Sequence, residues 1–176
     1  MRNFVIYLIS ILFYFSCSTM EEDAVSVEEK QYPDQESWNT EIILTKDGQK
    51  KATVLAGHFT KNNDESVVVL DGSVDVDFFN ENQSHISHLK SLRARVNEST
   101  NDLIAEGNVV VVSDSGVTLF TEELRWDHKR ERILSKVFIT LISDFDTLTG
   151  IGFESDSDLK NWIIEKPAGV TDRTLK

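Results

Sequence analysis

Residues 107–141 read GNVVVVSDSGVTLFTEELRWDHKRERILSKVFITL, and this stretch decides the fold. Its apolar residues form short runs that are rich in β-branched side chains and alternate with polar residues, which is typical of half-buried β-strands. Two clusters of turn-forming residues, 113–116 and 127–132, separate the runs. The pattern predicts a β-meander, in which antiparallel strands follow one another through short turns. No nucleophile motif, metal-ligand cluster or phosphate-binding loop interrupts it, so we expect the protein to act through the surfaces of a sheet.

The same alternation continues on both sides of this stretch. The body is expected to begin near Trp38, with strands at 42–45, 52–60, 67–70, 74–78, 85–96, 147–153 and 162–164. Asp47-Gly48 is a strong hairpin signal, and Pro167 is expected to end the last strand. Residues 85–96 are compatible with a strand and with a short helix. We favour a strand, because Ile86, His88, Lys90, Leu92, Ala94 and Val96 alternate with mostly polar neighbours and would share one face.

A weak internal repeat supports a layered β-fold. Residues 70–76 and 105–111 share a Gly-containing entry into an alternating strand and lie 35 residues apart. Units of this kind stack, because a single hairpin cannot bury its apolar face. We therefore expect an all-β fold, either a two-sheet roll or an open sandwich, whose interior is lined by one side chain in two.

The length and the net charge of the chain limit the functions that it can have. A chain of 176 residues allows one domain with appendages. Its 18 basic and 30 acidic residues give a net charge of −12, which argues against binding to nucleic acid and against electrostatic docking on anionic lipid. The single cysteine, Cys17, excludes an intramolecular disulfide and a cysteine-based zinc site.

The N-terminus has the pattern of an export signal. Arg2 precedes a run from Phe4 to Phe15 that is apolar except for Ser10. This run has the length of a signal-peptide core and is too short to span a membrane. Ser16-Cys17 then follows, as in a bacterial lipoprotein signal that is cut before a lipidated cysteine, although Tyr14 stands where that motif usually has Leu. The alternative is an uncleaved anchor with an incidental cysteine. Both interpretations export the domain and tether it to a membrane.

Changes in composition along the chain predict the boundaries between its segments. Residues 1–17 are expected to form the signal peptide or short anchor, residues 18–37 an acidic flexible linker, residues 38–166 the β-body and residues 167–176 a polar tail. Cleavage before Cys17 would also remove Arg2, leaving 17 basic and 30 acidic residues and a net charge of −13.

No catalytic or metal-binding constellation is expected. His85 and His88 lie three residues apart, which on a regular strand places them on opposite faces, so no metal site is predicted. The acidic segment 154–158 lacks the spacing of a calcium loop and is interpreted as a surface turn. Gly150-Ile151-Gly152 lacks the third glycine of a nucleotide fingerprint and more often marks a bulge. We therefore expect no enzyme activity and no cofactor.

Two non-enzymatic functions suit an exported β-structure. An open roll with an apolar interior can hold acyl chains, because each buried CH₂ group contributes about 0.8 kcal/mol. Its edge strands can also accept a strand from a partner. The alternative is an exported, membrane-tethered β-sandwich that acts only as a protein–protein assembly factor of the cell envelope.

Several short motifs resemble the LptC family, the periplasmic, membrane-anchored component of the lipopolysaccharide export system. The resemblance is carried by residues 115–126 with Ile133 behind them, by residues 105–109, by residues 146–153 and by residues 158–162. It covers roughly residues 38–166 and extends to the wider OstA-like group. Within that group, the size of the chain, its N-terminal anchor and the Gly-x-Gly-Phe segment at 150–153 favour LptC.

The resemblance implies a twisted, open β-jellyroll of two antiparallel sheets, with lipopolysaccharide acyl chains between the sheets. It also implies two partners. The N-terminal edge would meet the inner-membrane Lpt ABC transporter, and the C-terminal edge would continue into the sheet of an LptA-like periplasmic protein. The expected location is the periplasm of a Gram-negative bacterium, tethered to the inner membrane. The chain departs from the family at its N-terminus, since family members usually keep a transmembrane helix.

The alternation of apolar and polar residues predicts which side chains line the lipid groove. They are Val74, Val76, Phe78, Val109, Val111, Leu119, Leu124, Trp126, Ile139 and Phe153. A bulge near Glu122 or Gly150 would reverse the facing of some of them. Because a protein with a charge of −13 repels phosphate groups, we expect it to hold the acyl chains and to leave the charged headgroup in water.

The lipoprotein interpretation is tested at Cys17. Replacing Cys17 with Ala is expected to abolish metabolic labelling of the protein with a radioactive fatty acid, because the thiol that would carry the lipid is lost. If the Cys17→Ala protein stays equally membrane-bound with an intact N-terminus, the uncleaved-anchor interpretation is the correct one.

Overall fold

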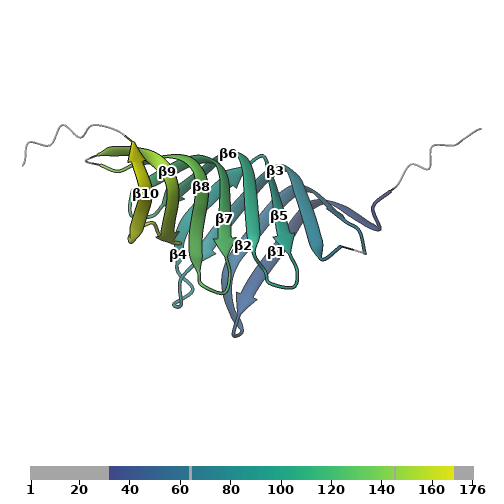
Figure 1. Cartoon of the computed structure of the whole chain (residues 1–176). Helices are drawn as coiled ribbons and strands as arrows, with labels where there is room; N and C mark the ends of the chain where they lie inside the picture. Colours follow the sequence, from purple (N-terminus) through teal and green to yellow (C-terminus); the bar gives the residue numbers. More distant parts are fainter. Residues whose placement is uncertain (1–31, 64, 145, 169–176) are drawn as a thin grey trace, which may run out of the picture. The chain divides into compact units, whose positions relative to one another are not determined.

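The computed structural model describes residues 32–63, 65–144 and 146–168, and all the regular structure in these ranges is β-strand (Figure 1). The strands in chain order are β1 (Gln35–Lys46), β2 (Gln49–Lys61), β3 (Val67–Phe79), β4 (His85–Ser91), β5 (Arg93–Asn97), β6 (Leu103–Ser113), β7 (Thr118–Asp127), β8 (Arg132–Ile142), β9 (Thr147–Asp156) and β10 (Trp162–Ala168). None of the described segments is a helix long and apolar enough to span a membrane.

The strands form one antiparallel sheet with the order β1-β2-β3-β4-β6-β7-β8-β9-β10, and β5 pairs with both β3 and β6. The prediction of an all-β jellyroll is therefore confirmed. The two sheets that the sequence suggested are two layers of one continuous sheet. Most neighbours in the sheet are also neighbours in sequence, as expected for a meander with short turns.

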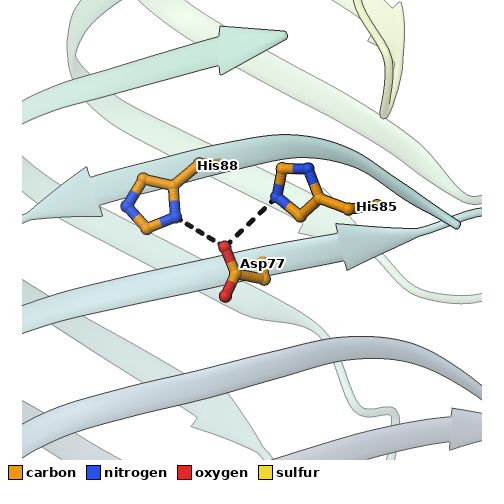
Figure 2. A group of neighbouring side chains, drawn as sticks. All are labelled: Asp77, His85 and His88. Atoms are coloured by element: carbon orange, nitrogen blue, oxygen red, sulfur yellow. Dashed lines mark hydrogen bonds and ion pairs between the residues drawn. The ribbon is translucent and has the colours of Figure 1, made fainter. Parts of the chain in front are cut away.

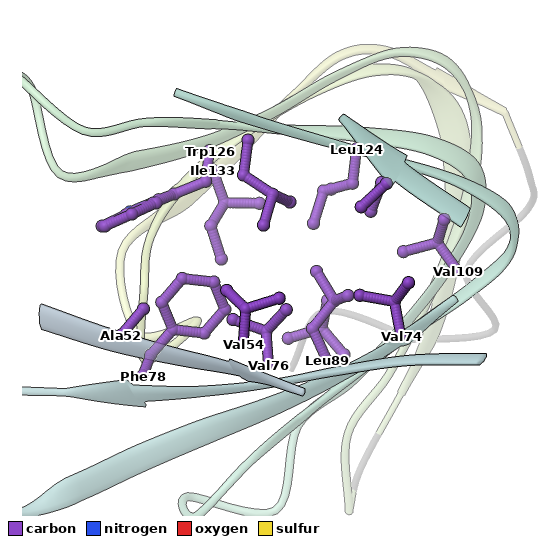
Figure 3. Packing of buried hydrophobic residues seen from close by; sticks show 14 of the residues in the cluster. Ala52, Val54, Val74, Val76, Phe78, Leu89, Val109, Leu124, Trp126 and Ile133 are labelled. Atoms are coloured by element: carbon purple, nitrogen blue, oxygen red, sulfur yellow. The ribbon is translucent and has the colours of Figure 1, made fainter. Parts of the chain in front are cut away.

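The two layers enclose an apolar core. Figure 3 shows side chains from β2, β3 and β4, such as Val54, Val76 and Leu89, pointing toward Leu124 and Trp126 of β7 and Ile133 of β8. The alternation of the sequence explains this arrangement, because on each strand every second side chain points to the same face. In β3 the core receives Val74, Val76 and Phe78, while Asp75 and Asp77 point outward.

A line of β-bulges crosses the sheet and bends its strands. Between β2 and β3, Gly57 alone lies opposite Gly72 and Ser73, and both of these residues have positive φ, 70° and 76°. A Cβ atom on Gly57 would lie 2.3 Å from the carbonyl oxygen of Gly72. The two strands approach so closely here that only glycine fits at position 57.

A second bulge of this kind lies in β6, 35 residues later, at the position of the internal repeat in the sequence. Gly107 (φ 81°) and Asn108 (φ 49°) both lie opposite Glu122 of β7, so β6 has one extra residue here. On the other side, the Leu92 amide donates a 3.0 Å hydrogen bond to the Gly107 carbonyl, and Leu92 is the residue at which β4 gives way to β5. The repeat in sequence is therefore a repeat of the bulge.

Further along the sheet, β8 and β9 shift register between Ser135 and Phe138, opposite Gly152 with φ 80°. The prediction that the glycines at 150–152 mark a bulge is confirmed. In β7 the shift falls between Thr121 and Arg125. It reverses the alternation at Glu122-Glu123, so that Leu119 and Leu124, an odd number of residues apart, both face the core.

The phase predicted for residues 85–96 is wrong in β4 and right in β5, where Ala94 and Val96 are buried. Ser87, Leu89 and Ser91 face the core, whereas Lys90 and Leu92 are exposed. The inward serines made the pattern ambiguous, since a hydroxyl can be buried once it is hydrogen-bonded. Ser87 meets this condition by donating a 2.5 Å hydrogen bond to the carbonyl of Ser157.

Both ends of the sheet are longer than expected. The first strand begins at Gln35, which pairs with Lys61 at the end of β2, rather than near Trp38. The last strand continues through Pro167 to Ala168, so the prediction that Pro167 ends it is wrong. Proline is tolerated on an edge strand, and it pairs here with Gly150, where a Cβ atom would come within 3.0 Å of the Pro167 Cα atom.

The bulge line predicts a glycine requirement at position 57. We expect Gly57→Ala to lower the free energy of unfolding by about 1–3 kcal/mol, because the added methyl group meets a backbone carbonyl that cannot move without breaking strand pairing. The matched control is Gly48→Asn, at a turn with φ 77° and no other atom within 4 Å of a Cβ. This control is expected to change stability by about 0.5 kcal/mol or less. Urea denaturation followed by tryptophan fluorescence measures both values, and equal midpoints for Gly57→Ala and wild type would contradict the argument.

Candidate functional site

The ten side chains predicted to line a lipid groove all lie in the interior between the two layers, each at most 1% exposed. They come from five strands: Val74, Val76 and Phe78 of β3, Val109 and Val111 of β6, Leu119, Leu124 and Trp126 of β7, Ile139 of β8 and Phe153 of β9. That they contact lipid stays a prediction. Their burial makes the interior a continuous apolar region across the sheet.

An aromatic contact joins the two layers. The rings of Phe78 on β3 and Trp126 on β7 meet edge to face, with centroids 5.3 Å apart and planes at 68°. Trp126 also meets His128 edge to face, at 5.2 Å. Within the described part of the chain, Trp126 Nε1 and His128 Nδ1 are buried without a hydrogen-bond partner. Such atoms are unusual in native proteins, and they offer a donor and a ring nitrogen to a guest molecule or a water.

Burial sets the charge of His128. It lowers the pKa of the imidazole below its usual value, and the nearby positive charge of Lys46 adds to the effect, against the opposing carboxylates of Glu131 and Asp102. His128 is therefore neutral at pH 7, and the buried aromatic group carries no net charge.

The loop between β9 and β10 covers the interior with Leu159, a residue that sequence analysis missed. Leu159 is fully buried in the core cluster and has φ 55°. Ser113 Oγ donates a 2.6 Å hydrogen bond to the Asp158 carbonyl, beside the bond from Ser87 to the Ser157 carbonyl, and the two bonds hold the loop against the sheet. Asp156 accepts hydrogen bonds from the amides of Lys160 and Asn161 and closes the turn. In the sequence, the only hint of this burial is that Leu159 is a single leucine beside the acidic residues Asp156 and Asp158.

The two outermost strands, β1 and β10, each pair with only one neighbour among the described strands. Their outer backbone groups are therefore available to another strand. Both edges also carry exposed apolar side chains, Trp38 at 62% and Ile43 at 56% on β1 and Ile163 at 64% on β10. Exposed apolar edges are the usual site of strand addition between chains.

The outer face of β6, β7 and β8 has an open hollow of about 590 Å³. Val110, Phe120, Val137 and Phe138 line it, and Phe120 and Phe138 are exposed at 41% and 55%. The hollow lies at the bulge line, where Asn108 and Glu122 also border it. An exposed apolar surface of this kind is typical of a contact site.

On the outer face of β3 and β4, the expectation for His85 and His88 was wrong. Both rings lie on the same side, beside Asp77. The reason is a register shift, since Phe78 pairs with Ser87 but Phe79 pairs with His85. Ile86 is the extra residue of the bulge, and it reverses the alternation between the two histidines.

The sequence model of one protein family, described as "Lipopolysaccharide-assembly, LptC-related", matches residues 4–164. The chain belongs to the LptC family. A search of the curated proteins gave no match. LptC has a role in lipopolysaccharide transport and assembly as a periplasmic, inner-membrane-associated component of the Lpt system, and it is not a known enzyme family. The matched range includes β1 to β9 and the first residues of β10. The buried interior and the two free edges described above are thus features of an LptC-type jellyroll.

The buried imidazole predicts a pH dependence of stability. Because the pKa of His128 is lower in the folded than in the unfolded protein, the unfolded protein binds a proton first as the pH falls below about 6.5. The stability contributed by neutral His128 is therefore present above that pH and lost below it. We expect the melting temperature of wild type to fall more between pH 7.5 and pH 5 than that of His128→Gln. The raised pKa values of His58 and His85 act in the opposite direction, but they are common to both proteins. Equal losses would show that His128 is not involved.

Proposed function

We propose that this LptC-family protein carries lipopolysaccharide by its acyl chains between the two layers of its sheet. It takes the lipid from the inner-membrane Lpt ABC transporter and passes it to an LptA-like periplasmic protein through edge-to-edge β-sheet contact. The N-terminal segment ending at Cys17, outside the described residues, tethers it to the periplasmic side of the inner membrane.

The apolar interior is the observation that supports this proposal. Side chains from five strands contribute to one cluster of buried apolar residues, with Val74 and Phe78 on one layer and Leu124 and Trp126 on the other. Each CH₂ group that moves from water into such a lining contributes about 0.8 kcal/mol. The ten lining residues carry no charge, and the net charge of −12 repels a phosphate. Acyl chains therefore enter, and the headgroup stays in water.

Entry of an acyl chain requires the interior to open. The lining residues are at most 1% exposed, so the two layers must separate or a covering segment must move. The loop that carries Leu159 is one such covering segment, and the hydroxyls of Ser87 and Ser113 hold it by hydrogen bonds to its backbone carbonyls. Trp126 Nε1 and His128 Nδ1 would gain a polar partner from the ester or hydroxyl groups of the guest.

The two free edges fit the two partners. β1 follows the membrane tether in sequence, so its edge, with Trp38 and Ile43, would meet the transporter. β10 lies at the opposite end of the strand order, and its edge, with Ile163, would extend into the partner's sheet. A lipid passed between sheets joined in this way would stay on an apolar surface throughout.

The close packing of the interior favours a second candidate function, that of a protein–protein assembly factor. The lining residues are packed closely enough to serve as an ordinary core, and the outer hollow at Phe120 and Phe138 offers a separate protein-contact surface. In that case the protein would act only as an assembly factor of the cell envelope, without carrying lipid.

Photo-crosslinking in cells distinguishes the two functions. A crosslinking amino acid at Phe78 or Ile139 is expected to capture lipopolysaccharide, because both positions face the interior. The matched controls are the adjacent positions Phe79 and Thr140, whose side chains face outward on the same strands and are expected to capture none. Capture is measured by immunoblotting for lipopolysaccharide on the purified protein.

The result is interpreted only for variants that accumulate as folded, protease-resistant protein. Failure at both inner positions, with folded protein present, would overturn the lipid-carrier proposal. Capture of protein alone, with the crosslinker at Phe120, would then support the assembly-factor alternative.

A further inference from the structure

Three potential metal ligands converge on the outer face of β3 and β4, away from the apolar interior. Asp77 Oδ1 lies 2.6 Å from His88 Nδ1 and 3.3 Å from His85 Nε2. One ligand atom from each of the three residues lies within 4.8 Å of the others. Figure 2 shows both rings turning one nitrogen toward the same carboxylate oxygen.

The second nitrogen of each histidine is held by a different carboxylate. His85 Nδ1 lies 3.0 Å from both oxygens of Asp114, in the turn after β6. His88 Nε2 lies 3.0 Å from Asp75 Oδ1, on the same strand as Asp77. A carboxylate in this position binds the N–H of the ring and fixes its tautomer, as it does for histidines that bind metal ions.

This arrangement determines what faces the centre of the cluster. When Asp114 and Asp75 each accept an N–H, the neutral rings present the lone pairs of His85 Nε2 and His88 Nδ1 toward the Asp77 carboxylate. Three electron-pair donors pointing at one another repel unless a positive charge lies between them. That charge is either a proton on a ring or a metal ion shared by the three groups.

We propose that Asp77, His85 and His88 bind one divalent transition-metal ion, with Zn²⁺ as the preferred ion. Two imidazoles and one carboxylate are a ligand set that Zn²⁺ accepts in tetrahedral geometry, with bonds of about 2.0–2.2 Å and hence donor atoms about 3.3 Å apart. The 3.3 Å separation of Asp77 Oδ1 and His85 Nε2 already matches this value. The shorter separation to His88 would widen by less than about 1 Å.

The site keeps one coordination position open. The side chains of Asp77, His85 and His88 are 38%, 38% and 30% exposed, so a water molecule or an external oxygen ligand can reach the ion. Asp75 also contacts Lys90 Nζ at 3.2 Å. The cluster still holds more carboxylates than fixed cations, and a bound Zn²⁺ would reduce that excess.

His58 on β2 provides a matched control. Its Nδ1 lies 3.0 Å from Asp71 Oδ1 and its Nε2 lies 2.8 Å from Glu36 Oε1, so it too bridges two carboxylates on the surface. Both of its nitrogens are used in this way, and His58 is not part of the three-ligand group. A protonated ring satisfies this arrangement fully, and no metal binding is expected there.

The test is a calorimetric titration of the untagged full-length protein, in detergent micelles and freed of metal with a chelator, with Zn²⁺ at pH 7.5. One equivalent is expected to bind. Asp75→Asn and Asp114→Asn are each expected to weaken binding by about 10–100-fold, as the loss of such outer carboxylates does in known sites. His85→Ala, His88→Ala and Asp77→Asn remove ligands and are expected to weaken it more. His58→Ala and Cys17→Ala are expected to leave the affinity unchanged.

Co²⁺ provides a second readout, which reports the coordination geometry of the bound ion. Visible absorption bands of tetrahedral Co²⁺ are expected in wild type and in His58→Ala, and their absence is expected in His88→Ala, with circular dichroism confirming that each variant is folded. The proposal is overturned if wild type takes up no stoichiometric Zn²⁺, if His58→Ala weakens binding as much as His88→Ala, or if binding depends on Cys17.

Discussion

The bulges that cross the sheet are the constraint on which the rest of the structure depends. At each of them two residues on one strand face one on the next, as Gly72 and Ser73 do opposite Gly57. The extra residue bends its strand. The alternation reverses in β7, where Leu119 and Leu124 both face the core, whereas β3 and β6 keep the same phase on both sides of their bulges. Because the bulges lie on neighbouring strands, the whole sheet bends along one line and its two halves can face each other.

Folding one sheet over itself has two consequences for function. The inner faces meet as an apolar lining that is joined across the layers by Phe78 and Trp126. The sheet also keeps two edges, β1 and β10, because it is folded without being closed. An apolar interior between two free edges suits an amphiphile that must stay out of water while it moves between proteins. The lipid-carrier function proposed above rests on this combination.

The outer face follows from the same register shifts. The bulge at Ile86 brings His85 and His88 to one side, next to Asp77. The bulge at Gly107 and Asn108 borders the apolar hollow around Phe120. These two irregularities therefore also place groups of side chains on the surface. The acidic outer face and the apolar interior remain separate because the two sides of each strand alternate.

The sequence by itself determined the all-β class, the meander order, the family and the burial of ten named side chains such as Val76 and Ile139. These follow from alternation and turn residues, which are local properties of the chain. Only the tertiary structure decided that the register shifts at Glu122-Glu123, which turns both Leu119 and Leu124 inward. It also decided that Leu159 is buried in the core although its neighbours form an acidic turn, and that His85 and His88 share a face. A bulge is a mismatch between two strands, and its position depends on the register of a partner that can be far away in sequence. The burial of Leu159 depends likewise on the Ser87 and Ser113 hydroxyls, which lie 70 and 45 residues from the carbonyls that they bind.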